Sequence, residues 1–155
     1  MTEPKRVGPE FYELKVEKIM QRRDVPLIEK DASVDHVLDV LSKKTHVWVT
    51  ESKGSKKIVG VITEHDVLSI LSPRRAPYAF GLPDLRALHW GTAESVMHRR
   101  LVKCGPKDTI RNVLNKMMEH GIRRLPVTKR NNIIVGEIRL FHVIKRYSAA
   151  LKELK

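Results

Sequence analysis

Apolar residues recur at intervals of three and four in one segment of each half of the chain. The positions are Val34, Val37, Leu38 and Leu41 in the first half, and Ile110, Val113, Leu114 and Met117 in the second. This spacing places apolar side chains on one face of a helix. Ser33 and Thr109 come directly before these segments, and a hydroxyl there can accept a hydrogen bond from a free backbone N–H of the first turn. The pattern predicts two N-capped helices, within 31–44 and 107–120, that contribute to a shared core.

Apolar runs of strand length lie on both sides of each predicted helix. A short run comes before it, at 25–28 in the first half and 101–103 in the second. Two more follow it, at 46–50 and 58–63, and again at 123–128 and 133–138. A polar turn separates the two runs of each pair, and a last helix begins directly after the second run. Each half therefore predicts the order strand, helix, strand, strand, helix.

The two halves are copies of one another. The stretch GVITEHDVL begins at Gly60, and GEIRLFHVI begins 76 residues later at Gly136. Each copy also opens with a short turn that ends in a methionine, Met20 or Met97. Repetition of this kind indicates one structural unit used twice. One copy alone buries too little apolar surface to be stable. We therefore expect an α/β (α+β) fold in which tandem βαββα repeats pack about a pseudo-twofold axis, with ligand clefts at their junction.

The repeat divides the chain into five parts. We predict an N-terminal extension (1–15), a first domain (16–72), a connecting strap (73–92), a second domain (93–148) and the end of a C-terminal helix (149–155). The stretch 72–92 contains three prolines and two glycines, so it cannot form one continuous helix or strand. We expect an ordered surface strap with a helical turn at 84–89. Alternatively, its aromatic residues line a ligand opening or a dimer contact: Tyr78, Phe80 and Trp90.

The composition is that of a folded protein with a basic surface. Of the 155 residues, 41% are hydrophobic and 31% are charged, which argues against wholesale disorder. The net charge of +12 indicates an anionic partner, either nucleic acid, a phosphorylated small molecule or an acidic protein surface. No apolar run approaches the roughly 20 residues that span a bilayer, and the N-terminus lacks the apolar core of a signal peptide. A single cysteine forms no internal disulfide, so we expect a reducing cytoplasm.

Residues that would carry catalysis or bind a metal form no recognisable motif. The seven histidines show no tight pairing at ligand spacing with one another or with cysteine, so no metal site is predicted. Cys104 lacks any sequence feature that would activate it as a nucleophile, and we interpret it as a structural thiol. A glycine-rich phosphate loop and a Gly-x-Ser-x-Gly elbow are also missing from the sequence. We therefore expect a protein that is not an enzyme.

Several stretches resemble one family. HGIRRLPVTKRNNIIVGEI (120–138) is similar to the middle of a cystathionine-β-synthase (CBS) domain, VGVITEHDVL (59–68) to its end, and EKIM and AESVM to its opening turn. A tandem pair of such domains, often called a Bateman module, would cover nearly all of the chain. The resemblance implies a regulatory module that binds AMP, ADP, ATP or S-adenosylmethionine and carries no catalysis. It also implies a homodimer.

Thr63 and Asp66 are the leading candidates for ligand contact. Thr63 ends a predicted strand, where its hydroxyl can cap the next helix and face an anion at the helix N-terminus. Asp66 lies in the first turn of that helix, where its carboxylate can accept two hydrogen bonds from a cis-diol such as that of ribose. The residues alone leave open a structural role, in which Thr63 is a cap and Asp66 complements the helix dipole. The resemblance favours ribose binding.

Arg123 and Arg124 are the candidates for phosphate contact. In the family, the residues just before Leu-Pro-Val of one copy reach the phosphates of a ligand whose ribose the other copy holds, and here those residues are the two arginines. Guanidinium groups suit phosphate because they offer several donors in a fixed fork and keep their charge. Because side chains alternate along a strand, we expect only one of the two to touch phosphate.

The equivalent polar positions differ in the second copy, where Arg139 and His142 replace the threonine and the aspartate. His142 is a poor diol acceptor because it lacks paired carboxylate oxygens. The first copy in turn has His46, and no arginine, where the second has its arginine pair. We therefore predict one complete nucleotide site, and a second, weaker or altered one formed by His46, Arg139 and His142.

The position of adenine follows from the resemblance. It implies that the base lies against the strand before the first helix, where backbone groups can read its edge. The residues of that strand are Val25, Pro26, Leu27 and Ile28. Val61 or Ile62 would supply an apolar wall, and Gly60 would let a ligand approach the backbone closely.

Two functions are compatible with these features. The first is a free-standing adenosine-nucleotide sensor that changes its affinity for an unidentified protein when the ligand binds. The second is a basic adaptor for nucleic acid, which the net charge of +12 supports, although no groove-reading helix or aromatic RNA-binding signature is recognisable.

Overall fold

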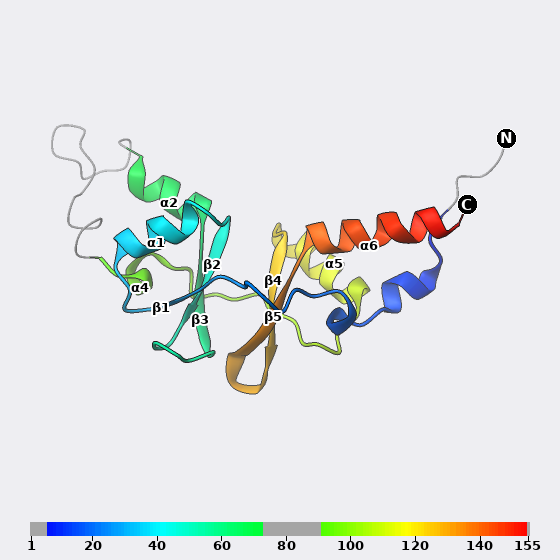
Figure 1. The fold of residues 1–155 in the computed structure, drawn as a ribbon, viewed down its shortest axis with the longest axis horizontal. Helices are drawn as coiled ribbons and strands as arrows, with labels where there is room; N and C mark the ends of the chain where they lie inside the picture. The colour runs from blue at the N-terminus through cyan, green and yellow to red at the C-terminus, as the bar shows by residue number, and fades with distance from the viewer. Residues whose placement is uncertain (1–5, 73–90, 155) are drawn as a thin grey trace. The chain divides into compact units, whose positions relative to one another are not determined.

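The computed structural model describes residues 6–72 and 91–154 of the chain. These residues form two compact units, one within 26–101 and the other from the segments within 1–25 and 102–155. Figure 1 shows the ribbon of these residues, and each unit has its own hydrophobic core. The helical turn predicted at 84–89 lies outside the described residues, as do the aromatic side chains predicted to line a ligand opening or a dimer contact: Tyr78, Phe80 and Trp90.

The unit within 26–101 contains a three-stranded sheet. Its strands are β1 (Leu27–Glu29), β2 (His46–Thr50) and β3 (Ile58–Thr63), in that order across the sheet. β1 is parallel to β2, and β2 is antiparallel to β3. Helices α1 (Val34–Leu41) and α2 (Glu64–Leu71) lie on the same side of this sheet in Figure 1, and the short helix α4 (Ala93–Val96) completes the unit. The strands predicted at 46–50 and 58–63 are confirmed with their bounds.

The other unit is built on a two-stranded antiparallel sheet. Its strands are β4 (Arg124–Lys129) and β5 (Ile133–Arg139), and its helices are α5 (Ile110–His120) and α6 (Leu140–Glu153). Among its described residues there are also short 3-10 helices: η1 (Pro9–Glu13), η2 (Val16–Lys18) and η4 (Arg130–Asn132). The order of helix, strand, strand and helix repeats that of the first unit.

The first strand expected in the second repeat does not form at 101–103. Only Cys104 pairs, in parallel, with Val127 as an isolated bridge. The Cys104 N–H donates to the Pro126 carbonyl at 3.1 Å, and the Thr128 N–H donates to the Cys104 carbonyl at 2.8 Å. The pairing stops there because Gly105 and Pro106 follow directly, and proline has no backbone N–H to continue a ladder.

The two predicted N-caps are confirmed. The Ser33 hydroxyl accepts from the His36 N–H at 3.2 Å, and the Thr109 hydroxyl accepts from the Asn112 N–H at 3.2 Å. The apolar faces also lie as expected, because the first residues of each face are fully buried and the others are buried or half-buried. At its C-terminal end α5 stops at Gly121, whose φ of 63° is a left-handed conformation that glycine adopts without strain.

The opening turn of each repeat packs on a strand of the other repeat. The Gln21 N–H donates to the Glu137 carbonyl on β5 at 2.8 Å, and the Glu137 N–H donates back at 2.9 Å. In the same way, the His98 N–H donates to the Val61 carbonyl on β3 at 2.9 Å, and the Val61 N–H donates back at 3.0 Å. The compact units therefore do not coincide with the sequence repeats, since each unit includes the opening turn of the other repeat.

Two glycines make this exchange sterically feasible. A Cβ on Gly60 would lie 2.5 Å from the Met97 sulfur and 2.8 Å from the His98 carbonyl oxygen, and one on Gly136 would lie 2.6 Å from the Gln21 carbonyl oxygen. Chain atoms thus fill the space that the sequence interpretation of Gly60 assigned to a ligand. That interpretation is wrong about what lies against Gly60, which is the protein chain and not a ligand. It is right that another group approaches the backbone closely there.

The described part of the N-terminal extension contributes Phe11 to the core of its unit. Phe11, on η1, is 4% exposed and packs edge-on against Tyr12 and against Tyr147 of α6, with ring centroids 5.4 and 5.0 Å away. Residues 9–13 therefore contribute apolar burial to the unit that contains α6.

Candidate functional site

The beginning of α2 carries the candidate ribose site. Thr63 is the last residue of β3, and Asp66 lies one turn into the helix. One carboxylate oxygen of Asp66, Oδ2, accepts from the Thr63 N–H at 2.8 Å and from the Thr63 hydroxyl at 3.2 Å. Asp66 therefore accepts from the backbone N–H of the residue before α2, a structural role different from the helix-dipole role that the sequence left open. The Thr63 hydroxyl donates to Asp66 here, so it is oriented towards the carboxylate.

The second oxygen of Asp66 has a different partner. Oδ1 contacts Nε2 of His98, while the Asp66 side chain is only 8% exposed and that of His98 is 63% exposed. His98 belongs to the opening turn of the second repeat, which pairs with β3 through Val61. Sequence reasoning did not connect His98 with Asp66. The repeat places His98 after Met97 as Gln21 follows Met20, but it does not specify the strand on which that turn packs.

The equivalent position in the second repeat also accepts a hydrogen bond from the backbone N–H before its helix, but the accepting side chain is a histidine and not an aspartate. His142 lies in the first turn of α6, and its Nδ1 accepts from the Arg139 N–H at 3.0 Å. A neutral ring that accepts at Nδ1 carries its proton on Nε2, so this site presents a donor where Asp66 presents acceptors. Burial lowers the pKa of His142 and Arg139 lowers it further, while Glu137 partly offsets both effects.

Arg139 is the second polar residue of this altered site. Its guanidinium carbon lies 5.5 Å from the centre of the exposed Phe141 ring. Its Nε is buried and makes no hydrogen bond within residues 6–72 and 91–154. Arg139 and His142 are thus brought together in one unit, as expected from their spacing.

His46 lies in the other unit. It is buried on β2, edge-on to Trp48 with ring centroids 5.3 Å apart, and its Nδ1 lies 3.0 Å from the Thr45 hydroxyl. Within its unit His46 is therefore a packed strand residue. Its membership of the altered site remains a prediction.

The two candidate phosphate ligands lie at the start of β4. Arg123 is exposed and its carbonyl accepts from the Leu140 N–H at 2.8 Å, whereas Arg124 is half-buried. Arg124 is directly opposite Arg139 in the β4–β5 ladder, so two cationic side chains share one rung of the sheet. Like charges directly opposite one another on neighbouring strands are destabilising in themselves.

The residues predicted to surround adenine differ in how far their side chains are exposed. Ile28 and Ile62 are 2% and 0% exposed and belong to the core of their unit. Val61 alternates with Ile62 along β3 and is half-buried, so of the two proposed wall residues it is the one that retains side-chain surface. Leu27 is exposed, while Val25 and Pro26 are half-buried.

Cys104 has the properties of a structural thiol. It is 3% exposed, and burial raises the pKa of its thiol to about 12, with the nearby Asp108 carboxylate adding to the rise. Within the described residues there is no cluster of three or more histidine, cysteine, aspartate or glutamate side chains able to hold a metal ion. None of the described helices combines the length and apolar character needed to cross a bilayer.

Comparison with known families assigns the chain to a class. The CBS domain family matches residues 16–73 and again 93–149. The chain therefore belongs to the CBS domain family and carries a tandem pair of these domains, which confirms the resemblance and the α+β fold predicted from the sequence.

Individual proteins are similar to this chain at low sequence identity. An uncharacterised conserved protein from Pyrococcus horikoshii has a TM-score of 0.69 at 22% identity, covering 90% of this chain and 56% of its own. A CBS domain pair solved with 5′-methylthioadenosine and S-adenosyl-L-methionine has a TM-score of 0.67 at 18% identity, covering 88% of this chain and 97% of its own. A homoserine O-acetyltransferase from Methanosphaera stadtmanae is 27% identical over 104 residues, 67% of this chain but only 18% of that protein.

Proposed function

We propose that this chain is a regulatory module that binds an adenosine-containing ligand, with Asp66 as the acceptor for the ribose hydroxyls. The observation that carries the proposal is the position of the Asp66 carboxylate, in the first turn of α2 and held in place by Thr63. A preorganised carboxylate suits a cis-diol because each of its oxygens accepts hydrogen bonds. The solved CBS pair that contains S-adenosyl-L-methionine and 5′-methylthioadenosine supports a ligand of this class.

The ligand is proposed to be AMP, ADP, ATP or S-adenosylmethionine. Arg123 and Arg124 would distinguish the nucleotides from adenosine, because guanidinium groups bind phosphate and adenosine has none. Alanine substitution of the one arginine that touches phosphate should weaken ATP binding by about tenfold or more and leave adenosine binding unchanged. If ATP and adenosine lost affinity equally, the arginines would not be phosphate ligands.

A thermal-shift series tests the central proposal. The full chain is titrated with adenosine, AMP, ADP, ATP and S-adenosylmethionine, and a ligand that binds the folded state raises the melting temperature. Asp66→Asn should abolish the rise for the preferred ligand, since the amide offers one acceptor oxygen and a donor in place of the carboxylate. Asp35→Asn, a change of the exposed carboxylate in the first turn of α1, is the matched control. An undiminished shift in Asp66→Asn would refute the ribose role.

The module is proposed to act as a homodimer that regulates another, unidentified protein in the cytoplasm, without catalysis of its own. Leu68 on α2 and Ile144 on α6 occupy equivalent repeat positions and are 62% and 57% exposed. Large apolar side chains left exposed at equivalent positions suit contact with a second copy. Leu68→Glu should shift the sedimentation coefficient from dimer to monomer, whereas Met118→Glu, at an exposed methionine of α5, should not.

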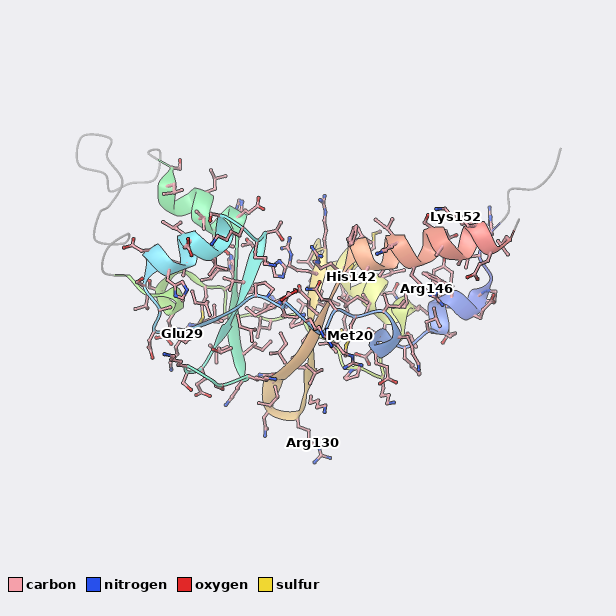
Figure 2. The ribbon with its side chains drawn as sticks, in the orientation of Figure 1. Met20, Glu29, Arg130, His142, Arg146 and Lys152 are labelled. Carbon is pink, nitrogen blue, oxygen red and sulfur yellow. The ribbon has the colours of Figure 1, made fainter. Side chains whose placement is uncertain are left out.

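Nucleic-acid binding is the alternative function. The net charge is +12, and α6 carries exposed Lys145, Arg146 and Lys152; Figure 2 labels the last two along this helix. If this alternative holds, affinity for random RNA or DNA will fall steeply with salt and will not respond to Asp66→Asn.

A further inference from the structure

The acceptor capacity of Asp66 is largely used within the protein. A carboxylate has about four lone-pair positions, two on each oxygen. Oδ2 receives two donors from Thr63, its N–H and its hydroxyl. Oδ1 contacts Nε2 of His98. One position on Oδ1 therefore remains for any further donor.

The backbone of His98 is held by hydrogen bonds, whereas its side chain is largely exposed. Its N–H and carbonyl both pair with Val61, and the preceding Met97 packs against Gly60 so closely that even a methyl group there would clash. The His98 side chain is nevertheless 63% exposed. The ring can therefore leave Asp66 by side-chain rotation without disturbing the strand pairing.

We propose that His98 is a built-in competitor for the ribose acceptor, which must leave Oδ1 of Asp66 before a cis-diol can bind there. The proposal rests on the assigned ribose role of Asp66. A diol brings two hydroxyl donors and needs two acceptor positions, while the carboxylate has one free. Displacement of His98 provides the second acceptor position. The ring therefore lowers the apparent affinity for the diol to the extent that it occupies Oδ1.

The competition makes His98 a determinant of sugar specificity. A 2′-deoxyribose has one hydroxyl in place of the diol, so it needs only the position that is already free. His98 therefore opposes ribose ligands and leaves deoxyribose ligands unaffected. Gln21, at the equivalent position of the first repeat, pairs with β5 and has no such role.

Calorimetric titration of the full chain with adenosine and 2′-deoxyadenosine tests this. These probes lack phosphate, so the arginines do not contribute. His98→Ala should tighten adenosine binding about three- to tenfold and leave 2′-deoxyadenosine binding within about twofold. His98→Gln retains a donor and should resemble the unsubstituted protein, and Gln21→Ala should change neither affinity.

The outcomes separate this inference from the proposed function. Loss of adenosine binding in Asp66→Asn, together with unchanged or weaker binding in His98→Ala, would overturn the competitor role and keep the ribose site. Equal tightening for both nucleosides in His98→Ala would also overturn it, because the effect would not depend on the diol. Adenosine binding that is unchanged in Asp66→Asn, or absent in every variant, would overturn both the competitor role of His98 and the ribose role of Asp66.

Discussion

Asp66 and His142 occupy equivalent positions in the two repeats, and each accepts a hydrogen bond from the backbone N–H of the residue just before its helix. The Thr63 N–H donates to Asp66 at 2.8 Å, and the Arg139 N–H donates to His142 at 3.0 Å. Both side chains satisfy an N–H that the helix itself leaves unpaired. The structural task is thus shared, while the carboxylate offers acceptors only and the neutral imidazole also carries a donor.

His142 should make the unit that contains α6 less stable in acid. Its folded-state pKa is lowered, chiefly by burial and then by Arg139, so protonation favours the unfolded chain. The contribution is fully present above the unfolded pKa of about 6.5 and is lost as the pH falls through the lower folded value. Protonated His142 also cannot accept from the Arg139 N–H. Urea midpoints measured between about pH 5 and pH 8 should fall towards the acidic end.

The matched variant for this experiment is His142→Asn. The asparagine oxygen can still accept from the Arg139 N–H, but it does not titrate, so the pH dependence should become shallower. His120→Asn changes an exposed histidine at the end of α5 and should retain the original slope. If His142→Asn and the unsubstituted chain lose stability in parallel, another group carries the acid response.

The secondary structure was largely predictable because its signals are local. Ser33 and Thr109 cap helices whose apolar spacing is regular, and β2 and β3 have the predicted bounds. The strand expected at 101–103 did not form. Pairing is limited to Cys104, and Gly105 and Pro106 stop it from continuing beyond that residue.

The candidate site was only partly predictable. Thr63 and Asp66 are three residues apart, so their contact follows from helix geometry. The contact between Asp66 and His98 instead depends on the exchange of opening turns between repeats, which brings residue 98 to β3. A linear repeat does not specify which copy its first turn packs against, and therefore His98 was not identified.

Phe11 should be required for stability although it lies in the N-terminal extension. It is almost fully buried and makes edge-on contacts with Tyr12 and Tyr147. Phe11→Ala should lower the free energy of unfolding by about 3–5 kcal/mol, measured by urea denaturation. Glu10→Ala, at an exposed position of the same 3-10 helix, should change it by less than about 0.5 kcal/mol. A small effect of Phe11→Ala would mean that η1 detaches readily.

Cys104 should resist thiol reagents until the protein unfolds. Its thiol is buried, and its pKa is raised to about 12, so reactive thiolate is scarce near neutral pH. Ellman's reagent at about pH 8 should react at least about a hundredfold more slowly with the folded chain than with the chain in denaturant. Because Cys104 is the single cysteine, the signal needs no further substitution. Rapid native labelling would contradict the burial of this residue.

Gly60→Ala tests the exchange of opening turns directly. The new methyl group would lie 2.5 Å from the Met97 sulfur and 2.8 Å from the His98 carbonyl oxygen. Methionine can rotate away, but the backbone oxygen is held by its pairing with Val61. Strand β3 and the 97–98 segment must therefore separate, which should cost about 1–3 kcal/mol of stability. Hydrogen exchange should locate the loss of protection at the amides of Val61 and His98.

The control for this variant is Gly105→Ala. A Cβ at that position would meet its nearest neighbour, the Thr128 carbonyl oxygen, at 3.8 Å, an ordinary contact, so stability should change little. Gly136→Ala should repeat the Gly60 effect in the other unit, because its Cβ would approach the Gln21 carbonyl oxygen to 2.6 Å. If Gly60→Ala and Gly105→Ala were equally mild, the opening turn could not lie against β3, and the contact between His98 and Asp66 would lose its structural basis.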